Sequence, residues 1–252
     1  MDLSKDTNLF ITTIVAAIIV NKLKYPAIVA DCDKIQIYNR IPTTKNKKIL
    51  NFSAGAGHWI YFLGVTKFIQ EEKYDITNTD FVGTSAGAFA SAVCAYNTPH
   101  DIIFEQALLH LERCRNNWFG CFGYWNTSYR KAVLDSCDQL QTVKPITNIF
   151  IGVSKLTPYG FQKQYFDGGL TSNEVATALQ TSCWIPFVTA PIFQPLFYVC
   201  NALYCDGFWT GKDDAPHAKQ LVIYPNKLER LPLYTYWLWL GNDYNTMLYT
   251  RI

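Results

Sequence analysis

The sequence has few of the features that mark metal-binding or nucleic-acid-binding proteins. Its 252 residues include four histidines and eight cysteines, and the cysteines form no CxxC pair and show no spacing typical of a zinc site. The formal net charge is +2 at pH 7, and no long run of lysine or arginine occurs. We therefore expect no metal centre and no nucleic-acid partner. We also expect mainly reduced, packed cysteines, with disulfides as the alternative.

The N-terminal apolar run is short for a membrane-spanning helix. Residues 9–20 read LFITTIVAAIIV, which is 12 residues without charge, whereas a spanning helix needs about 20. The residues before this run lack the net positive charge of a signal peptide. We expect a buried or interfacial segment, and we favour a cytoplasmic or peripheral-membrane location. A signal peptide or anchor at residues 9–20 is the alternative.

Two consecutive strand–loop–helix units predict an α/β fold. The first has a strand at residues 49–52, a loop of small residues and a helix with apolar residues at helical spacing up to Phe68. The second has a strand that ends at Val82, a glycine-rich turn and a helix that begins at Ala86. Such units form parallel sheets covered by helices. With 49% hydrophobic residues, the chain can bury one substantial core.

The rest of the pattern extends this domain. It predicts a helix over residues 100–115, a strand over 146–157, and a helix that starts near 172, with Ser172 or Asn173 as its N-cap. Residues 116–129 are aromatic and glycine-punctuated, and we expect a loop there. Residues 197–209 are expected to form two strands joined at Asp206 and Gly207, and residues 220–226 a final strand. We therefore expect three parts. Residues 1–46 form an N-terminal apolar segment with lead-in strands, residues 47–225 form the main domain, and residues 226–252 form an aromatic-rich segment that packs on the main domain.

Ser85 is a candidate nucleophile. It stands in the pattern Gly-x-Ser-x-Gly, between an expected strand and an expected helix, and composition predicts only about 0.03 chance occurrences of this pattern. The glycines at 83 and 87 would let the strand end and the helix start approach closely, since bulkier side chains would collide. The helix N-terminus would also favour negative charge at Ser85. A glycine-rich turn that binds phosphate is the alternative.

A second loop of small residues lies one strand–loop–helix unit upstream. The backbone amides of Gly55, Ala56 and Gly57 could point at one oxygen, as the oxyanion of a tetrahedral intermediate requires. A phosphate-binding loop is the competing interpretation. The loop lacks the lysine of a Walker motif and the complete G-x-G-x-x-G pattern, which disfavours nucleotide binding.

A serine nucleophile needs a base, and two kinds are available. A Ser-Asp-His triad would need a late histidine, and His217 is the candidate. A carboxylate acting directly on Ser85 could be Asp167 or Asp206, each of which is followed by glycine. Because Asp-Gly is also a favoured hairpin turn, each of these two pairs could instead be only a turn.

Taken together, these motifs resemble the patatin-like phospholipase family. The glycine-rich loop of that family corresponds to AGAGHW at residues 54–59, and its nucleophile motif to GTSAG at residues 83–87. The family's A-S-x-x-I-P element corresponds to ALQTSCWIP at residues 178–186, and an Asp-Gly pair follows it. Asp206 lies after this element and Asp167 before it, so the resemblance selects Asp206, with Gly207 as the turn residue.

The resemblance covers residues 47–225 and implies both fold and chemistry. The implied fold is a three-layer α/β domain with a mostly parallel central sheet and helices on both faces. The implied function is a lipid acyl hydrolase of the phospholipase, lysophospholipase or acylglycerol lipase type, using a Ser85–Asp206 dyad, an acyl-enzyme and no cofactor. Its partner would be a lipid substrate or a membrane surface; the oligomeric state is left open.

The sequence departs from the family pattern mainly in the two outer motifs. Alanines at 54 and 56 and Trp59 stand where the family has glycine, His58 where it has arginine or lysine, and Phe208 where it has glycine or alanine. Alanine keeps its amide N–H, so it can still donate to an oxyanion where φ is negative. These departures leave one alternative open, a catalytically impaired protein of this kind that binds lipid or a protein partner.

Overall fold

The computed structural model describes residues 34–42, 47–55, 59–116, 124–140, 145–167, 171–191, 194–210 and 220–223. The N-terminal run at 9–20, loop residues 56–58, His217 and the C-terminal segment 226–252 lie outside these ranges. The expectations for those segments therefore stay predictions, and so do the proposed domain boundaries.

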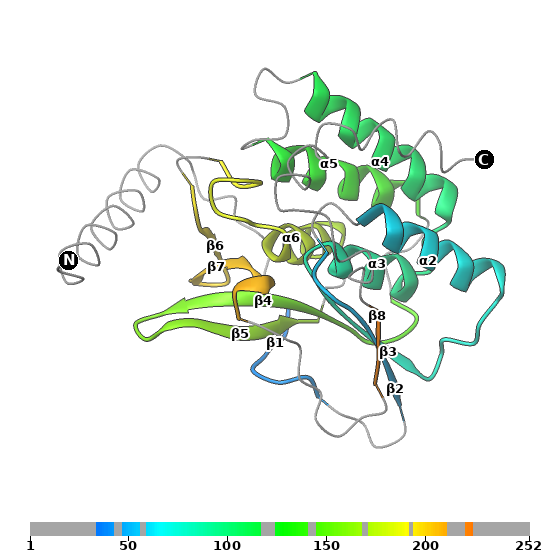
Figure 1. Ribbon diagram of the computed structural model, residues 1–252, viewed down its shortest axis with the longest axis horizontal. Helices are drawn as coiled ribbons and strands as arrows, with labels where there is room; N and C mark the ends of the chain where they lie inside the picture. Colours follow the sequence, from blue (N-terminus) through cyan, green and yellow to red (C-terminus); the bar gives the residue numbers. More distant parts are fainter. Residues whose placement is uncertain are drawn as a thin grey trace, which may run out of the picture.

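The described strands form one eight-stranded sheet (Figure 1). The strands are β1 (Ile37–Tyr38), β2 (Lys48–Phe52), β3 (Thr79–Thr84), β4 (Ile149–Thr157), β5 (Gly160–Phe166), β6 (Phe197–Val199), β7 (Ala202–Asp206) and β8 (Gln220–Ile223). The main order is β1-β5-β4-β3-β2-β8. Its centre, β4-β3-β2-β8, is parallel, while β1, β5, β6 and β7 pair antiparallel.

Strand β4 changes its partner halfway along. Its first half runs parallel to β3, with Gly152 opposite Thr84. Its second half pairs antiparallel with β7, with Val153 opposite Asp206. The carboxyl end of β3 and the carboxyl end of β7 therefore meet at the same point of β4, beside Gly152.

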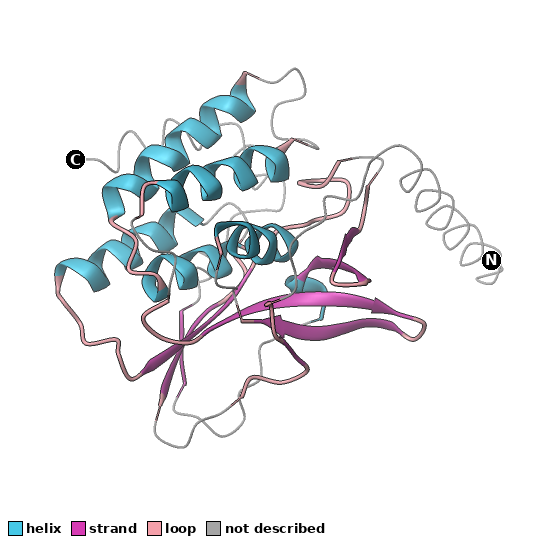
Figure 2. Ribbon diagram, turned by 180° about the vertical axis from the view of Figure 1, so that it is seen from behind, coloured by secondary structure: helices cyan, strands magenta, loops and turns pink. Residues whose placement is uncertain are grey.

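The described helices stack in two layers above one face of the sheet (Figures 1 and 2). They are α2 (Trp59–Glu71), α3 (Ala86–Ala95), α4 (His100–Arg115), α5 (Trp125–Asp138) and α6 (Ser172–Ser182). Helices α3 and α6 contact the sheet, α2 packs beside α3, and α4 and α5 lie outside them. One apolar cluster joins all five helices to Phe52, Phe81 and Ile151 of the sheet. A smaller cluster, which includes Ile41 and Phe150, fills the opposite face.

The expected α/β class and the parallel centre of the sheet are confirmed, and the sheet with its two helical layers makes three layers. Helices were expected on both faces of the sheet, whereas those of the described residues all lie on one face (Figures 1 and 2). Helix α5 begins at Trp125, inside the segment for which we expected a loop. Helix α6 is capped by Thr171 rather than Ser172 or Asn173, in a reciprocal capping box with Glu174.

Residues 197–209 also differ from the expectation. The turn between β6 and β7 is at Cys200 and Asn201, both with positive φ, whereas Asp206 ends β7 and Gly207 opens the short 3₁₀ helix η2 (Gly207–Thr210). Asp206-Gly207 is therefore not the hairpin turn. Within the ranges given above, no helix combines the length and apolar composition needed to cross a membrane.

Candidate active site

Ser85 occupies a strained turn between β3 and α3. Its backbone has φ 56° and ψ −125°, a conformation that non-glycine residues rarely adopt, and it serves as the N-cap residue of α3. This strand-to-helix turn with a positive φ at serine is the geometry of a nucleophile elbow. The side chain is largely buried, with 5% of the residue exposed.

The two glycines of the elbow have no room for a side chain. A Cβ at Gly83 would lie 2.6 Å from the carbonyl carbon of Gly87, and a Cβ at Gly87 would lie 2.6 Å from that of Phe52. Gly87 thus holds the first turn of α3 against the end of β2. The chain leaves β2 at Phe52, so Ser53, the first residue after the strand, lies beside the elbow.

Alanine at position 87 is expected to destabilise the fold by at least ~3 kcal/mol, because its Cβ would meet backbone that cannot move aside as a side chain can. Urea unfolding of Gly87→Ala measures this loss. Gly64→Ala is the matched control, since nothing lies within 4 Å of a Cβ there. Gly64 is exposed on α2, so alanine should stabilise the control by about 0.5–1 kcal/mol. Equal stabilities for the two variants would contradict the close packing at Gly87.

Asp206 lies at the end of β7 with its carboxyl group inside the protein. The residue is 1% exposed, and its Oδ1 accepts a hydrogen bond of 2.8 Å from the Phe208 N–H. Its Oδ2 makes no hydrogen bond of ordinary geometry with any described residue. The Ser85 side chain is nevertheless close enough to lower the pKa of Asp206. One carboxylate oxygen is thus held by the backbone, and the other is available to Ser85.

Burial makes Asp206 a stronger base than an ordinary aspartate. Its pKa is raised from 3.8 to about 6, because desolvation outweighs the lowering by the Phe208 N–H, the Ser85 side chain and the charge of Lys163. A carboxylate with a pKa near 6 is still mostly ionised at pH 7 and accepts a proton more readily than one near 3.8. The environment therefore suits a general base.

The end of α6 and the residues that follow it connect the two candidate catalytic residues. Ser182 Oγ accepts the Ser85 N–H at 2.8 Å and donates to the Gly152 carbonyl at 2.7 Å. Two residues on, the Trp184 carbonyl accepts the Asp206 N–H at 2.9 Å. This segment belongs to the Ile-Pro element of the sequence. Because the Ser85 N–H is committed to Ser182, donors to an oxyanion must come from elsewhere.

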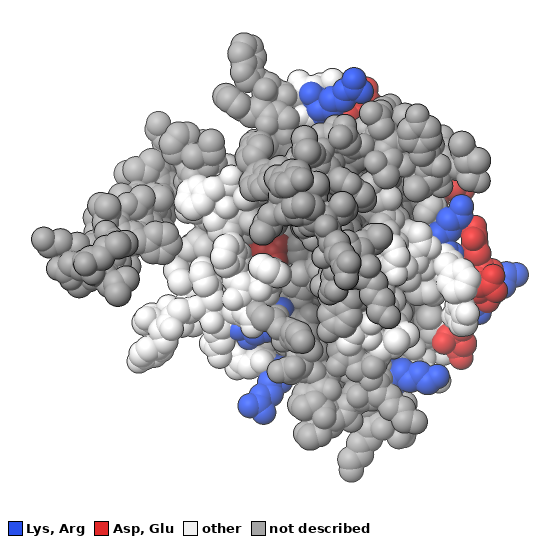
Figure 3. All heavy atoms as spheres, in the orientation of Figure 1, with Lys and Arg blue, Asp and Glu red and all other residues white. Residues whose placement is uncertain are grey.

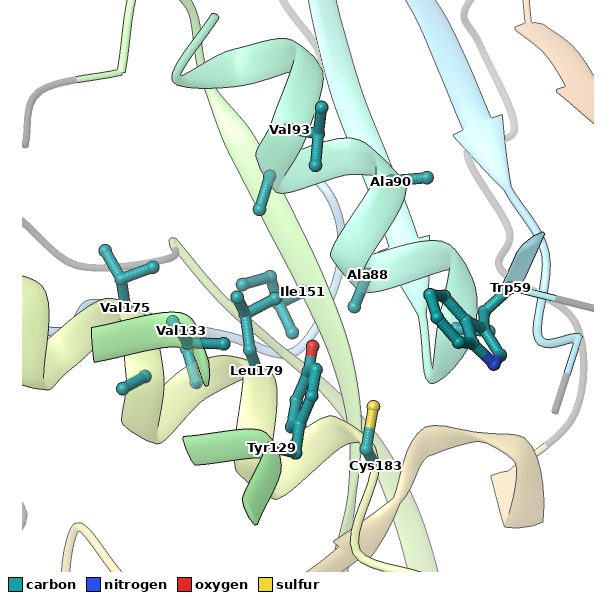
Figure 4. Packing of buried hydrophobic residues seen from close by; sticks show 14 of the residues in the cluster. Trp59, Ala88, Ala90, Val93, Tyr129, Val133, Ile151, Val175, Leu179 and Cys183 are labelled. Carbon is teal, nitrogen blue, oxygen red and sulfur yellow. The ribbon is translucent and has the colours of Figure 1, made fainter. Parts of the chain in front are cut away.

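Cys183 and Tyr129 line the same buried region. Burial raises the pKa of the Cys183 thiol, and the nearby charge of Asp206 raises it further, whereas Tyr129 and Ser85 lower it. Burial likewise raises the pKa of Tyr129, so both groups are neutral at pH 7. Figure 4 shows Tyr129 and Cys183 below the first turn of α3, with Trp59 at its side. The described thiols, at 94, 114, 137, 183, 200 and 205, are all reduced.

Trp59 is part of the core rather than of the loop. It is the first residue of α2, is 6% exposed, and packs edge-to-face against Phe89 and Trp125 at 6.5 Å. Of the predicted oxyanion donors, Gly55 is described and buried, and Ala56 and Gly57 lie outside the described ranges. Trp59 thus opens α2 and packs in the core beside α3 and α5.

The alternative bases are placed differently. Burial raises the pKa of Tyr96, the residue that ends α3, and the charges of Cys137 and Asp167 raise it further. Asp167 therefore lies toward the end of α3, whereas Ser85 lies at its start, and ten helical residues span about 15 Å. His217 lies outside the described ranges. The structure brings Asp206, and not Asp167, to Ser85.

Two residues at the site went unnoticed in the sequence. Ser182 occupies the serine position of the A-S-x-x-I-P element, so the motif contained a signal for it. Lys163 contacts, from β5, the two segments that carry the candidate residues Ser85 and Asp206, yet it stands in an ordinary strand with no motif around it. Only the pairing of β5 with β4 brings it to the site.

No protein-family model matches this chain. A search of curated proteins finds no match either. Among solved structures, the chain is similar to VipD from Legionella pneumophila, with 12% sequence identity and a TM-score of 0.41 over 70% of this chain and 49% of VipD. The chain therefore spans about half the length of that protein.

Proposed function

We propose that this protein is a serine hydrolase of the patatin-like type that cleaves carboxylic esters of lipids with a Ser85–Asp206 dyad. The observation that carries the proposal is the strained Ser85 elbow with a buried carboxylate, of pKa about 6, beside it. Strain at a non-glycine residue persists only where the surrounding structure enforces it, and it is concentrated at functional sites.

The proposed reaction needs only groups of this chain and water. Asp206 Oδ2 accepts the Ser85 proton as Ser85 Oγ attacks the ester carbonyl carbon. Collapse of the tetrahedral intermediate breaks the ester C–O bond, and the leaving alcohol takes the proton from Asp206. Water then attacks the acyl-enzyme with Asp206 again as base, which releases the fatty acid and restores Ser85. Backbone amides of Gly55, Ala56 and Gly57 are the proposed oxyanion donors.

A lipid surface is the proposed source of substrate. Phe208 and Trp209 directly follow Asp206 and its glycine, and they are 68% and 52% exposed. Exposed aromatic residues that close to the proposed base suit the boundary between water and lipid. Figure 3 shows described charges of both signs along the edge of the molecule where α2 lies, and further Lys or Arg side chains at the lower left. The formal net charge of +2 is close to balance, which disfavours a polyanion as the substrate.

A substrate panel tests the function. The wild-type protein is offered phosphatidylcholine vesicles, lysophospholipid micelles, a triacylglycerol emulsion and a water-soluble short-chain ester, and a fluorophosphonate probe is mapped by mass spectrometry. We expect ester hydrolysis and labelling at Ser85. Binding to vesicles without turnover of any substrate would favour the non-enzymatic alternative.

Replacing His217 with alanine is expected to change kcat/KM for the short-chain ester less than about threefold, because the proposed base is Asp206. Asp167→Asn should be equally mild, since Asp167 lies toward the other end of α3. Steady-state kinetics at pH 7.5 checks both. If His217→Ala instead lowers kcat/KM more than about 1,000-fold, a Ser-Asp-His triad is the correct mechanism.

A further inference from the structure

Lys163 is bonded to both segments that carry the proposed dyad. From β5, its Nζ donates to Thr84 Oγ1 at 3.2 Å and to the Gly207 carbonyl at 3.0 Å. Thr84 directly precedes Ser85, and Gly207 directly follows Asp206. One ammonium group thus joins the turn of the nucleophile to the turn of the base.

Strand β4 has a glycine, Gly152, at the position where this ammonium group packs. A Cβ at Gly152 would lie 3.1 Å from both Cε and Nζ of Lys163 and would overlap Thr84 Oγ1. Gly207 is equally constrained, because a Cβ there would lie 2.7 Å from the carbonyl carbon of Gly152 and 2.8 Å from Thr84 Cγ2. The two glycines leave the space in which Thr84, Lys163 and the chain after Asp206 meet.

We propose that Lys163 is a positioning residue for the Ser85–Asp206 pair. Its ammonium group holds the turn at Ser85 and the turn at Asp206 at a fixed separation, and it supplies the positive charge that keeps the buried carboxylate ionised. This inference rests on the proposed dyad. The two hydrogen bonds of the ammonium group go to Thr84 Oγ1 and the Gly207 carbonyl, which neighbour the proposed reacting residues, so the role assigned to the lysine is positioning. It acts through the placement of Ser85 and through the charge balance at Asp206.

Within the part of the chain that the structure describes, three titratable groups interact with the Asp206 carboxyl: the thiols of Cys183 and Cys205 and the ammonium group of Lys163. Burial raises the pKa of Cys205 to about 12 and raises that of Cys183 as well, so both thiols are neutral near pH 7. Lys163 is the positive charge that lowers the pKa of Asp206. Its loss should therefore raise that pKa.

The test is a direct titration of Asp206. In protein with ¹³C-labelled aspartate, the Asp206 carboxyl resonance is assigned by its absence in Asp206→Asn and followed from pH 4 to 9. We expect Lys163→Met to move the Asp206 midpoint upward by about 0.5–1 pH unit, and Lys163→Arg to restore it. Lys155→Met, which removes a charge from β4 of the same hairpin, should leave the midpoint unchanged.

The labelling rate of Ser85 by a fluorophosphonate probe is the second readout. Lys163→Met should slow it at least about tenfold at pH 7, because both the geometry and the charge are lost. Lys163→Gln keeps a hydrogen-bond donor but loses the charge. It should therefore shift the Asp206 titration midpoint upward, while Ser85 is labelled faster than in Lys163→Met. This variant also carries the test if Lys163→Met does not fold.

An Asp206 midpoint that is the same in wild type, Lys163→Met and Lys163→Gln overturns the inference about Lys163, whatever the labelling rate does. An upward shift that Lys163→Arg reverses supports it. Absence of labelling in the wild type counts against the proposed function instead, because the titration of Asp206 reports on Lys163 without any turnover. The two failures are therefore distinguishable.

Discussion

Ser85→Ala is expected to lower ester hydrolysis by at least about four orders of magnitude and to abolish fluorophosphonate labelling. The proposed chemistry forms a covalent bond from Ser85 Oγ, and the neighbouring thiol of Cys183 is kept neutral because burial raises its pKa. Initial rates on the short-chain ester and on phosphatidylcholine vesicles, with mass mapping of the probe, measure the loss. Labelling that persists in the variant would remove Ser85 from the mechanism.

Ser85→Gly is the matched control, because it separates chemistry from fold. Both variants lose the hydroxyl, but alanine keeps the strain of a side chain at φ 56° and glycine relieves it. The free energy of unfolding of Ser85→Gly, measured in urea, should therefore exceed that of Ser85→Ala by about 1 kcal/mol. Both variants should be inactive. Equal stabilities would show that the turn is not strained.

Asp206→Asn should lower kcat/KM about 1,000-fold and at the same time stabilise the fold at neutral pH. The loss follows because an amide cannot accept the Ser85 proton. In the wild type, activity should fall as the pH drops below about 6, where Asp206 becomes protonated. A pH–rate profile and urea unfolding at several pH values measure the two effects.

The sign of the stability effect follows from the direction of the pKa change. The folded-state pKa of Asp206, about 6, lies above the ordinary value of 3.8, so folding favours the protonated carboxyl. That stabilisation is complete below pH 3.8 and is lost as the pH rises through about 6. The rise corresponds to roughly 3 kcal/mol, and asparagine avoids this cost. The stability gap between Asp206→Asn and wild type should therefore widen between pH 4 and 7; a gap independent of pH would contradict the buried charge.

Local sequence patterns predicted the turn that carries Ser85, together with the strand before it and the helix after it. The elbow could be recognised because Gly83, Ser85 and Gly87 all lie within one turn of chain, where steric limits act between near neighbours. The strand before it and the helix after it also followed from short-range periodicity. The choice of Asp206 needed the order of motifs along the chain, since Asp167 has the same Asp-Gly pair.

Long-range contacts determined what the sequence could not reveal. Lys163 reaches Thr84 only because β5 folds back along β4, and nothing near residue 163 records this pairing. Helix α5 begins inside an aromatic, glycine-punctuated segment, where burial of Trp125 and Tyr129 against the core outweighs weak local helix propensity. The hairpin turn at Cys200 was missed because Asp-Gly is the more familiar turn pair.

The change of partner along β4 has a consequence for when the proposed dyad can be assembled. The Ser85 amide and the Ser182 hydroxyl are 97 residues apart in the chain, and Asp206 follows later still. The elbow can form early from neighbouring residues, but the base joins β4 only once β7 has been synthesised and paired. On the proposed mechanism, a nascent chain would therefore contain Ser85 before its proposed base, and the dyad would be assembled only when synthesis of the sheet is nearly complete.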